Sequence, residues 1–178
     1  MGKIGLFYGT DTGNTERIAK KIKELIDSKL GEGTVDVLEI YKKKKEDMAA
    51  YELLILGMPT WYDGELQGDW ESFIPEMQQI DFAPKKVAFF GLGDQYGYSN
   101  YFVDALQVFG ELVESKGGKL YGLWPVAGYE HDYSKAQRGD QFLGLALDVD
   151  NQDDLTDTRV QQWVTQVLGE FGLAGQPS

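Results

Sequence analysis

Short apolar runs recur along the chain, and stretches with helical periodicity lie between them. The runs are Lys3–Tyr8, Val35–Ile40, Leu53–Gly57 and Val87–Gly91. Each is almost continuously apolar, which is typical of parallel strands that helices cover on both faces. Because successive parallel strands need a crossover helix between them, this alternation predicts an α/β fold with a parallel central sheet.

Several stretches carry apolar residues at the spacing of one helix face, with polar residues on the outer side. Their apolar positions are Ile18, Ile22, Leu25 and Ile26; Val103, Leu106, Phe109, Leu112 and Val113; and Val160, Trp163, Val164, Val167 and Phe171. Thr156 or Asp157 is expected to cap the last of these helices, because a side-chain oxygen there could accept from a backbone N–H.

The fifth strand has two candidates, Lys119–Trp124 and Phe142–Leu147. The segment between them, PVAGYEHDYSKAQRGDQ, is polar and rich in turn residues. One edge strand interrupted by an inserted loop explains both pieces. With 178 residues and no linker or internal repeat, the chain is expected to form a single domain over residues 1–178.

Composition excludes several kinds of site. The chain has no cysteine, which rules out disulfides, iron–sulfur clusters and thiolate nucleophiles. Its one histidine, His131, lies in a polar stretch where a solvated loop position is expected, so no metal site is predicted. A net charge of −12 argues against nucleic-acid binding, and no apolar run is long enough for membrane insertion. The expected location is the cytoplasm.

The acidic side chains are distributed unevenly. Residues 46–84 contain nine acidic residues and no lysine or arginine. Two interpretations remain open: added solubility, or a negative face that steers basic partners toward the molecule. The four lysines at 42–45 are expected to form a solvated basic spot in a loop.

The segment GTDTGNT, residues 9–15, directly follows the first apolar run. It lacks the lysine and the glycine spacing of a Walker A loop, and it contains no dinucleotide-binding fingerprint. It offers instead the hydroxyls of Thr10, Thr12 and Thr15, the Asn14 amide and the backbone N–H groups of a helix start. This set suits one phosphate monoester held without a metal, with a plain helix cap as the alternative.

Two further segments that follow strands are rich in glycine and aromatic residues: PTWYDGELQGDW, residues 59–70, and GLGDQYGYSNYF, residues 91–102. Their aromatic loop residues are Trp61, Tyr62, Tyr96, Tyr98 and Tyr101. Aromatic side chains in such turns are placed to cover a flat ring, with surface packing as the alternative. Since ligands bind beyond the carboxyl ends of parallel strands, the three loops together describe a ligand with one phosphate and a flat ring, namely flavin mononucleotide (FMN).

On these segments the chain resembles the flavodoxins, and specifically their long-chain group. The motifs are FYGTDTGNTERIA, PTWYDGELQGDW, FGLGDQYGYSNYF and FLGLALDVDNQ with the segment before it, in the family's order over nearly the whole chain. The resemblance implies a three-layer α/β/α fold with a five-stranded parallel sheet of order 2-1-3-4-5. It also implies a long-chain insertion, at about residues 120–142, that interrupts the fifth strand, and FMN bound non-covalently.

The resemblance also assigns site residues. The phosphate would be held by Thr10, Asp11, Thr12, Gly13, Asn14 and Thr15. Trp61 and Tyr98 would flank the two faces of the isoalloxazine. Backbone groups would meet the ring edge at Pro59, Thr60, Tyr62, Asp63 and Gly64, and at Leu92, Gly93 and Asp94. The neighbours of the ring or the ribityl chain would be Asp94, Tyr101 and Asp150.

The implied function is one-electron transfer at low potential, mainly between flavin semiquinone and hydroquinone, with no catalytic residue. The anionic hydroquinone would be destabilised by aromatic side chains that exclude water and by an acidic shell. The shell candidates are Asp63, Glu65, Asp69, Glu71 and Asp94. A backbone peptide is expected to turn its carbonyl toward flavin N5 on reduction, with Tyr62–Asp63 as the first candidate and Asp63–Gly64 as the second.

The family's partners are basic faces of redox proteins, such as ferredoxin-NADP reductase, photosystem I, nitrogenase reductase and activators of radical enzymes, and a monomer is expected. An FMN-dependent NAD(P)H reductase would need a second nucleotide site, which the sequence does not show. A receiver domain would need acidic residues where Tyr8-Gly9 and Gly57-Met58-Pro59 stand. A regulatory FMN-binding module is the non-redox alternative. The insertion is either a partner-recognition element or a tolerated surface loop.

Overall fold

Three of the four apolar runs form the centre of a parallel sheet in the computed structural model, which describes residues 2–173. The fourth, Val35–Ile40, was expected to be a buried strand but forms the sheet edge, where most of its side chains are only partly buried. The main strands are β1 (Ile4–Tyr8), β2 (Val35–Glu39), β3 (Leu53–Trp61), β5 (Lys86–Leu92) and β10 (Leu145–Leu147). They pair in the spatial order β2-β1-β3-β5-β10, which confirms the predicted order 2-1-3-4-5. All side chains of β1 are buried, as expected for a strand with helices over both faces.

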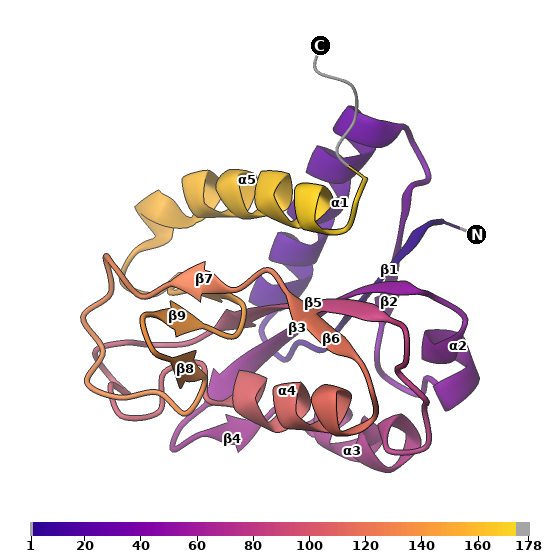
Figure 1. The fold of residues 1–178 in the computed structure, drawn as a ribbon. Helices are drawn as coiled ribbons and strands as arrows, with labels where there is room; N and C mark the ends of the chain where they lie inside the picture. Colours follow the sequence, from indigo (N-terminus) through magenta and orange to yellow (C-terminus); the bar gives the residue numbers. More distant parts are fainter. Residues whose placement is uncertain (1, 174–178) are drawn as a thin grey trace.

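Helices cover the two faces of the sheet and complete the three layers (Figure 1). One layer contains α1 (Asn14–Leu30) and α5 (Asp153–Glu170), and the other contains α3 (Gly68–Met77) and α4 (Ala105–Ser115). The predicted apolar stripes of α1, α4 and α5 face the sheet, with Ile18, Phe109 and Trp163 fully buried. Val103, predicted on the stripe of α4, lies outside that helix, because its φ of 50° is not helical and α4 begins at Ala105. Within residues 2–173, no helix is long and apolar enough to cross a membrane.

The last helix begins earlier than the sequence analysis expected. Its N-cap is Gln152, so the predicted caps Thr156 and Asp157 lie inside the helix, and that expectation is wrong. Asp153 and Asp154 occupy the first turn instead, where negative charge is favourable at the positive end of the helix dipole.

The fifth strand is interrupted, as predicted. Strand β6 (Lys119–Tyr121) pairs with the first half of β5, and β10 pairs with its second half, both in parallel. Residues 122–144, called the insertion below, lie between them and form a small antiparallel sheet beside the main one (Figure 1). The strands of this sheet are β7 (Trp124–Pro125), β8 (Gln137–Arg138) and β9 (Gln141–Phe142).

Two loop expectations are corrected by the structure. The basic run does not end in a loop, because Lys45 begins α2 (Lys45–Ala49) and its Nζ donates to Gln79 Oε1 at 2.7 Å. His131 is half-buried rather than solvated, since its ring packs against Phe102 and Phe142 at centroid distances of 5.4 and 5.1 Å. Phe142 comes from β9 of the insertion sheet, and Phe102 comes from the segment before α4.

Candidate functional site

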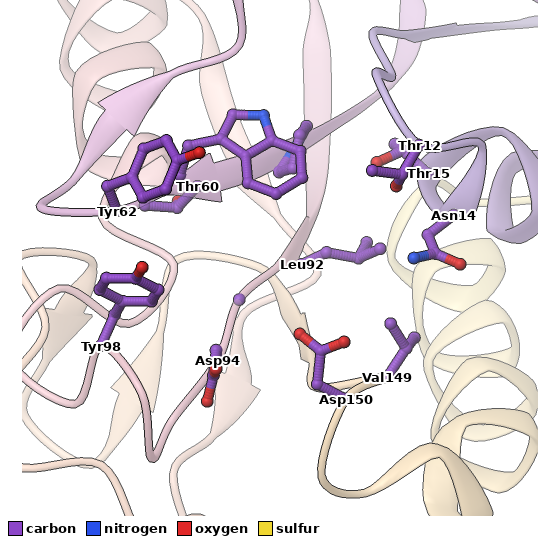
Figure 2. Close-up of a pocket in the computed structure, with 13 residues that line it drawn as sticks. Thr12, Asn14, Thr15, Thr60, Tyr62, Leu92, Asp94, Tyr98, Val149 and Asp150 are labelled. Atoms are coloured by element: carbon purple, nitrogen blue, oxygen red, sulfur yellow. The ribbon is translucent and has the colours of Figure 1, made fainter.

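An open pocket lies at the carboxyl ends of β1, β3 and β5 (Figure 2). This is the edge of the sheet where the strand order reverses, and ligands of doubly wound folds bind there. Four separate segments line the pocket: Thr12, Asn14 and Thr15 after β1; Pro59, Thr60, Trp61 and Tyr62 at the end of β3; Leu92, Gly93, Asp94 and Tyr98 after β5; and Val149 and Asp150 after β10.

The loop after β1 turns directly into the start of α1. Gly13 has a φ of 90°, and its N–H donates to Thr10 Oγ1 at 2.9 Å. Arg17 N–H donates to Gly13 O at 3.0 Å, so the N–H groups of Asn14 and Thr15 come before the first intrahelical bond. These N–H groups lie at the positive end of the helix dipole, which makes the loop a site for an anion.

Gln67 fixes this loop from the neighbouring helix. Its buried side chain caps α3 by accepting from Trp70 N–H at 3.1 Å. Its Nε2 donates to Asp11 Oδ1 at 3.1 Å and to Asp69 Oδ2 at 2.9 Å. Gln67 therefore holds the carboxylate of Asp11. The backbone N–H groups of the loop remain available to an anion. The sequence analysis missed Gln67, for which the only signal was its place directly before a helix start.

The aromatic segment after β3 is a hairpin and not the open loop that the sequence suggested. Strand β3 continues to Trp61, which pairs with Glu65 of β4 (Glu65–Leu66). Residues 62–64, called the 62–64 turn below, close the hairpin with φ values of 46° at Tyr62 and 90° at Gly64. A glycine in this left-handed conformation closes short hairpin turns without a steric cost, which explains the sharp reversal.

Trp61 carries an unused donor in the pocket wall. Its Nε1 is buried and has no hydrogen-bond partner among residues 2–173. A buried indole N–H normally finds an acceptor. The residues present therefore fit a ligand that carries oxygen acceptors beside an aromatic ring. FMN is such a ligand, because its phosphate and ribityl chain carry oxygen atoms next to the flavin ring.

The pocket has an aromatic end and a polar end. Figure 2 shows Tyr62 and Tyr98 opposite each other at one end, with Thr12, Thr15 and Asn14 at the other. The two tyrosine rings meet edge to face at 5.9 Å, and they are 58% and 38% exposed. Both rings are thus partly open to solvent at the aromatic end of the pocket.

Asp94 organises the loop that carries Tyr98. Its Oδ1 accepts from Gly97 N–H at 2.7 Å, from Tyr96 N–H at 3.0 Å and from Asn151 Nδ2 at 2.8 Å. Burial acts to raise the pKa of Asp94, but these hydrogen bonds outweigh it and hold the pKa below its usual value. A fixed negative charge therefore lies in the pocket wall.

Asp150 lies between Asp94 and Val149 in the view of the pocket and adds a second carboxyl group (Figure 2). Burial, and then the negative charges of Asp94 and Asp148, raise the pKa of Asp150. Val149 also lines the pocket, although the sequence analysis did not name it. Its only signal was its position between the last strand and Asp150.

Other predicted site residues lie around the pocket. Asp11 lines an adjoining hollow with Trp61, Tyr62, Glu65 and Leu66. Tyr101 lies behind the 62–64 turn, where a Cβ on Gly64 would be 3.6 Å from its Cδ1. Of the proposed acidic shell, Asp94 lines the pocket and Glu65 lines the hollow, whereas Asp63 is exposed in the turn and Asp69 and Glu71 lie in the first turn of α3. Tyr96 is 58% exposed at the surface.

The sheet order and the pocket place this chain in the class of doubly wound α/β proteins whose ligand site lies at the switch point of the sheet. The family model described as flavodoxin matches residues 6–163. The chain belongs to the flavodoxin family, as the sequence motifs predicted. Flavodoxins are electron carriers, so the prediction of a redox carrier in place of an enzyme is confirmed at the level of the family.

Curated relatives and solved structures agree with this assignment. The flavodoxin of Synechococcus elongatus is 49% identical, over 97% of this chain and 100% of the relative. Flavodoxin 1 of Escherichia coli K12 is 48% identical, over 97% of each chain. The crystal structure of Fusobacterium nucleatum flavodoxin bound to FMN has a TM-score of 0.88 at 31% identity, over 96% of this chain and 99% of that one.

Proposed function

We propose that this chain carries single electrons at low potential between redox proteins on non-covalently bound FMN. FMN supplies the one-electron chemistry, and the protein binds it, orients it and sets its potential. One observation carries the proposal: a single pocket joins the anion site at the start of α1 to an aromatic end at Trp61 and Tyr98. Residues 1–178 are proposed to act as one FMN-binding domain, interrupted by the insertion.

The predicted residues keep their roles in this proposal, with two refinements. The backbone N–H groups at the start of α1 and the hydroxyls of Thr12 and Thr15 hold the phosphate. Thr10 steadies the loop through its bond from Gly13 N–H. Trp61 covers one face of the ring, and its free indole N–H donates to the polar chain of the ligand.

The charges around the ring set a low potential. Asp94 is held ionised in the pocket wall, and residues 59–70 and 91–102 contain no lysine or arginine to offset it. A negative charge that develops on the ring is therefore disfavoured, and each ~1.4 kcal/mol of this effect corresponds to about 59 mV for one electron. The phosphate, held without a cation, adds to the same field.

The proposed partners present basic faces to the acidic rim of the pocket. Ferredoxin-NADP reductase, photosystem I and nitrogenase reductase are candidates of this chemistry. Exposed acids such as Asp63 and Glu65 next to the pocket support electrostatic steering toward them. A monomer in the cytoplasm is part of the proposal, to be tested by sedimentation and cell fractionation.

An anaerobic reductive titration followed by absorption tests the proposal. FMN-loaded protein should pass through a stable one-electron-reduced form with a broad long-wavelength band, and then bleach slowly. Direct passage from yellow to colourless would indicate a two-electron flavoenzyme, and failure to retain added FMN would refute the site. NADPH alone should leave the flavin oxidised, whereas bleaching by NADPH would indicate a reductase.

A further inference from the structure

Asp104 is a buried carboxyl group that does not serve its own helix. It occupies the N-cap position of α4 and is 3% exposed, yet its side chain makes no capping bond. Aspartate at this position usually accepts from the first turn of the helix. Here Thr60 Oγ1, from the end of β3, accepts from Ala105 N–H at 3.0 Å instead. The carboxyl group of Asp104 is therefore free for another contact.

The two oxygens of Asp104 face two different segments. Oδ1 accepts from the backbone N–H of Lys135, in the insertion, at 2.9 Å. Oδ2 is buried and has no hydrogen-bond partner among the described residues. It points at the 62–64 turn, because a Cβ on Gly64 would lie 3.2 Å from it. Asp104 thus stands between the insertion and the hairpin that carries Trp61.

The backbone is strained on both sides of this contact. Val103, directly before Asp104, is fully buried with a φ of 50°, which is a rare conformation for a β-branched residue. Tyr62 also has a positive φ in the facing turn. Such conformations persist only where the surrounding structure holds them, and they concentrate at functional sites.

An ionised buried oxygen without a donor costs free energy. Burial raises the pKa of Asp104, while the N–H and the charge of Lys135 and the hydroxyl of Ser134 oppose that rise. The Ser134 hydroxyl already donates to Phe102 O, so the missing partner is left to the segment in contact with Oδ2, which is the 62–64 turn. A small rotation of a peptide in this turn would direct an N–H toward Oδ2.

We propose that Asp104 is a positioning residue for the 62–64 turn, whose backbone N–H donates to Oδ2 when a flavin ring occupies the pocket. Because Oδ1 is held by Lys135 N–H, the insertion then sets the position of the turn and of the adjacent Trp61. The inference rests on the proposed function only in that FMN is the ligand. It assigns the insertion a role in shaping the flavin site.

The pH dependence of the turn amides tests the contact directly. In ¹⁵N-labelled protein with FMN bound, the NMR chemical shift of an amide proton in residues 62–64 should change with pH as Asp104 becomes protonated. This change should be absent in Asp104→Asn. The other titratable groups beside the turn are Asp63 within it, Glu65 directly after it, Tyr101 behind it and Lys135 in the insertion. The Asp63→Asn variant described next separates the effect of the carboxyl group in the turn from that of Asp104. An amide that does not respond to pH in the wild-type protein overturns the inference.

Asp63→Asn is the matched control, because it removes a carboxylate from the turn itself and leaves Asp104 in place. It should keep the titration of the turn amide, whereas Asp104→Asn should lose it and bind FMN about tenfold more weakly, as expected for one hydrogen bond to a charged group. Equal FMN affinity in Asp104→Asn and wild type would overturn the inference. The wild-type titration remains decisive where that variant fails to fold. Failure of the wild type to bind FMN would refute the proposed function instead.

Discussion

Single residues set the shape of the pocket wall, and Gly64 is the clearest case. Its φ of 90° closes the 62–64 turn, and its Cα faces Asp104 and Tyr101. Gly13 has the same φ, but nothing lies within 4 Å of its missing Cβ. A side chain at Gly13 therefore meets only the conformational cost, whereas one at Gly64 also meets packed neighbours.

Gly64→Pro should lower the yield of one-electron-reduced flavin during reductive titration. Proline fixes φ near −65°, which is incompatible with this turn, and the hairpin end can no longer adjust to the ring. The yield is read from the long-wavelength absorption band. Gly33→Ala serves as the control for a left-handed glycine as such, because Gly33 has a φ of 83°, nothing lies within 4 Å of its missing Cβ, and it does not line the pocket; the yield should stay close to wild type. An unchanged yield in Gly64→Pro would exclude a role for the turn.

At the scale of elements, the amino ends of the first three main strands are tied by one carboxylate. Asp36 Oδ2, on β2, accepts from Tyr51 Oη at 2.7 Å and from Gly2 N–H at 2.8 Å. The bond from Tyr51 is the largest cause that lowers the pKa of Asp36. Burial, and then this bond, raise the pKa of Tyr51 to about 12.

Tyr51→Phe should lower the free energy of unfolding by roughly 1–2 kcal/mol near pH 7. Asp36 has a lowered folded pKa, so its contribution is present above pH 3.8 and is lost as pH falls through the folded pKa. Tyr51 has a raised folded pKa, so its contribution is present below pH 10.0 and is lost as pH rises toward 12. Urea unfolding measured from acidic to alkaline pH should show the largest difference in unfolding free energy between wild type and Tyr51→Phe near neutral pH. A difference independent of pH would argue against this ion-linked bond.

Gln67 joins α3 to the phosphate-binding loop, and changing its charge tests that link. Gln67→Glu places a buried carboxylate against Asp11 and Asp69 in place of a donor, and should cost about 1–3 kcal/mol of unfolding free energy at pH 7. The loss should be smaller at pH 5, because the introduced group is then more often protonated. Gln67→Met removes the bonds without adding charge. Equal stability of both variants at each pH would contradict this account.

Some elements could be predicted from the sequence and others could not. The buried strands follow from short apolar runs, and α1, α4 and α5 follow from apolar residues at helical spacing. The extension of β3 to Trp61 was missed, because Pro59 and Gly64 read as loop residues while the pairing with Glu65 across the turn stabilises the strand. The start of α5 was misplaced because an acidic first turn can begin a helix without a side-chain cap.

At the scale of the whole molecule, the acidic charge should control encounter with partners. Electron transfer from a reductase with a basic face should slow at least about tenfold between low salt and about 0.3 M salt, because the screening length falls below 10 Å. Stopped-flow absorption measures the rate. The same salt series with an uncharged small reductant should change little. If the rate with the reductase also fails to change with salt, steering by the net charge of −12 is refuted.

The pocket was predictable where its residues lie at or after strand ends in recognisable motifs: Thr12 and Tyr98 follow strands, and Trp61 is the last residue of β3. Asp104 and Gln67 were not, because their importance depends on contacts with residues 31 and 56 positions away along the chain. No local pattern separates Asp104 from an ordinary helix cap. Only the packed molecule shows that Thr60 has taken over the capping bond.

The pocket draws its lining from both Thr12 and Asp150, and α1 packs beside α5 through the Arg17–Asp153 and Lys21–Asp157 ion pairs. A chain made from its amino end at ~5–20 residues per second exposes the phosphate-binding loop on the order of ten seconds before Asp150 emerges. During that interval the nascent chain contains β1, β3 and β5 but lacks α5, which completes the helix layer formed with α1. The complete pocket therefore exists only after Asp150 has emerged, and the newly made chain exists first without its ligand.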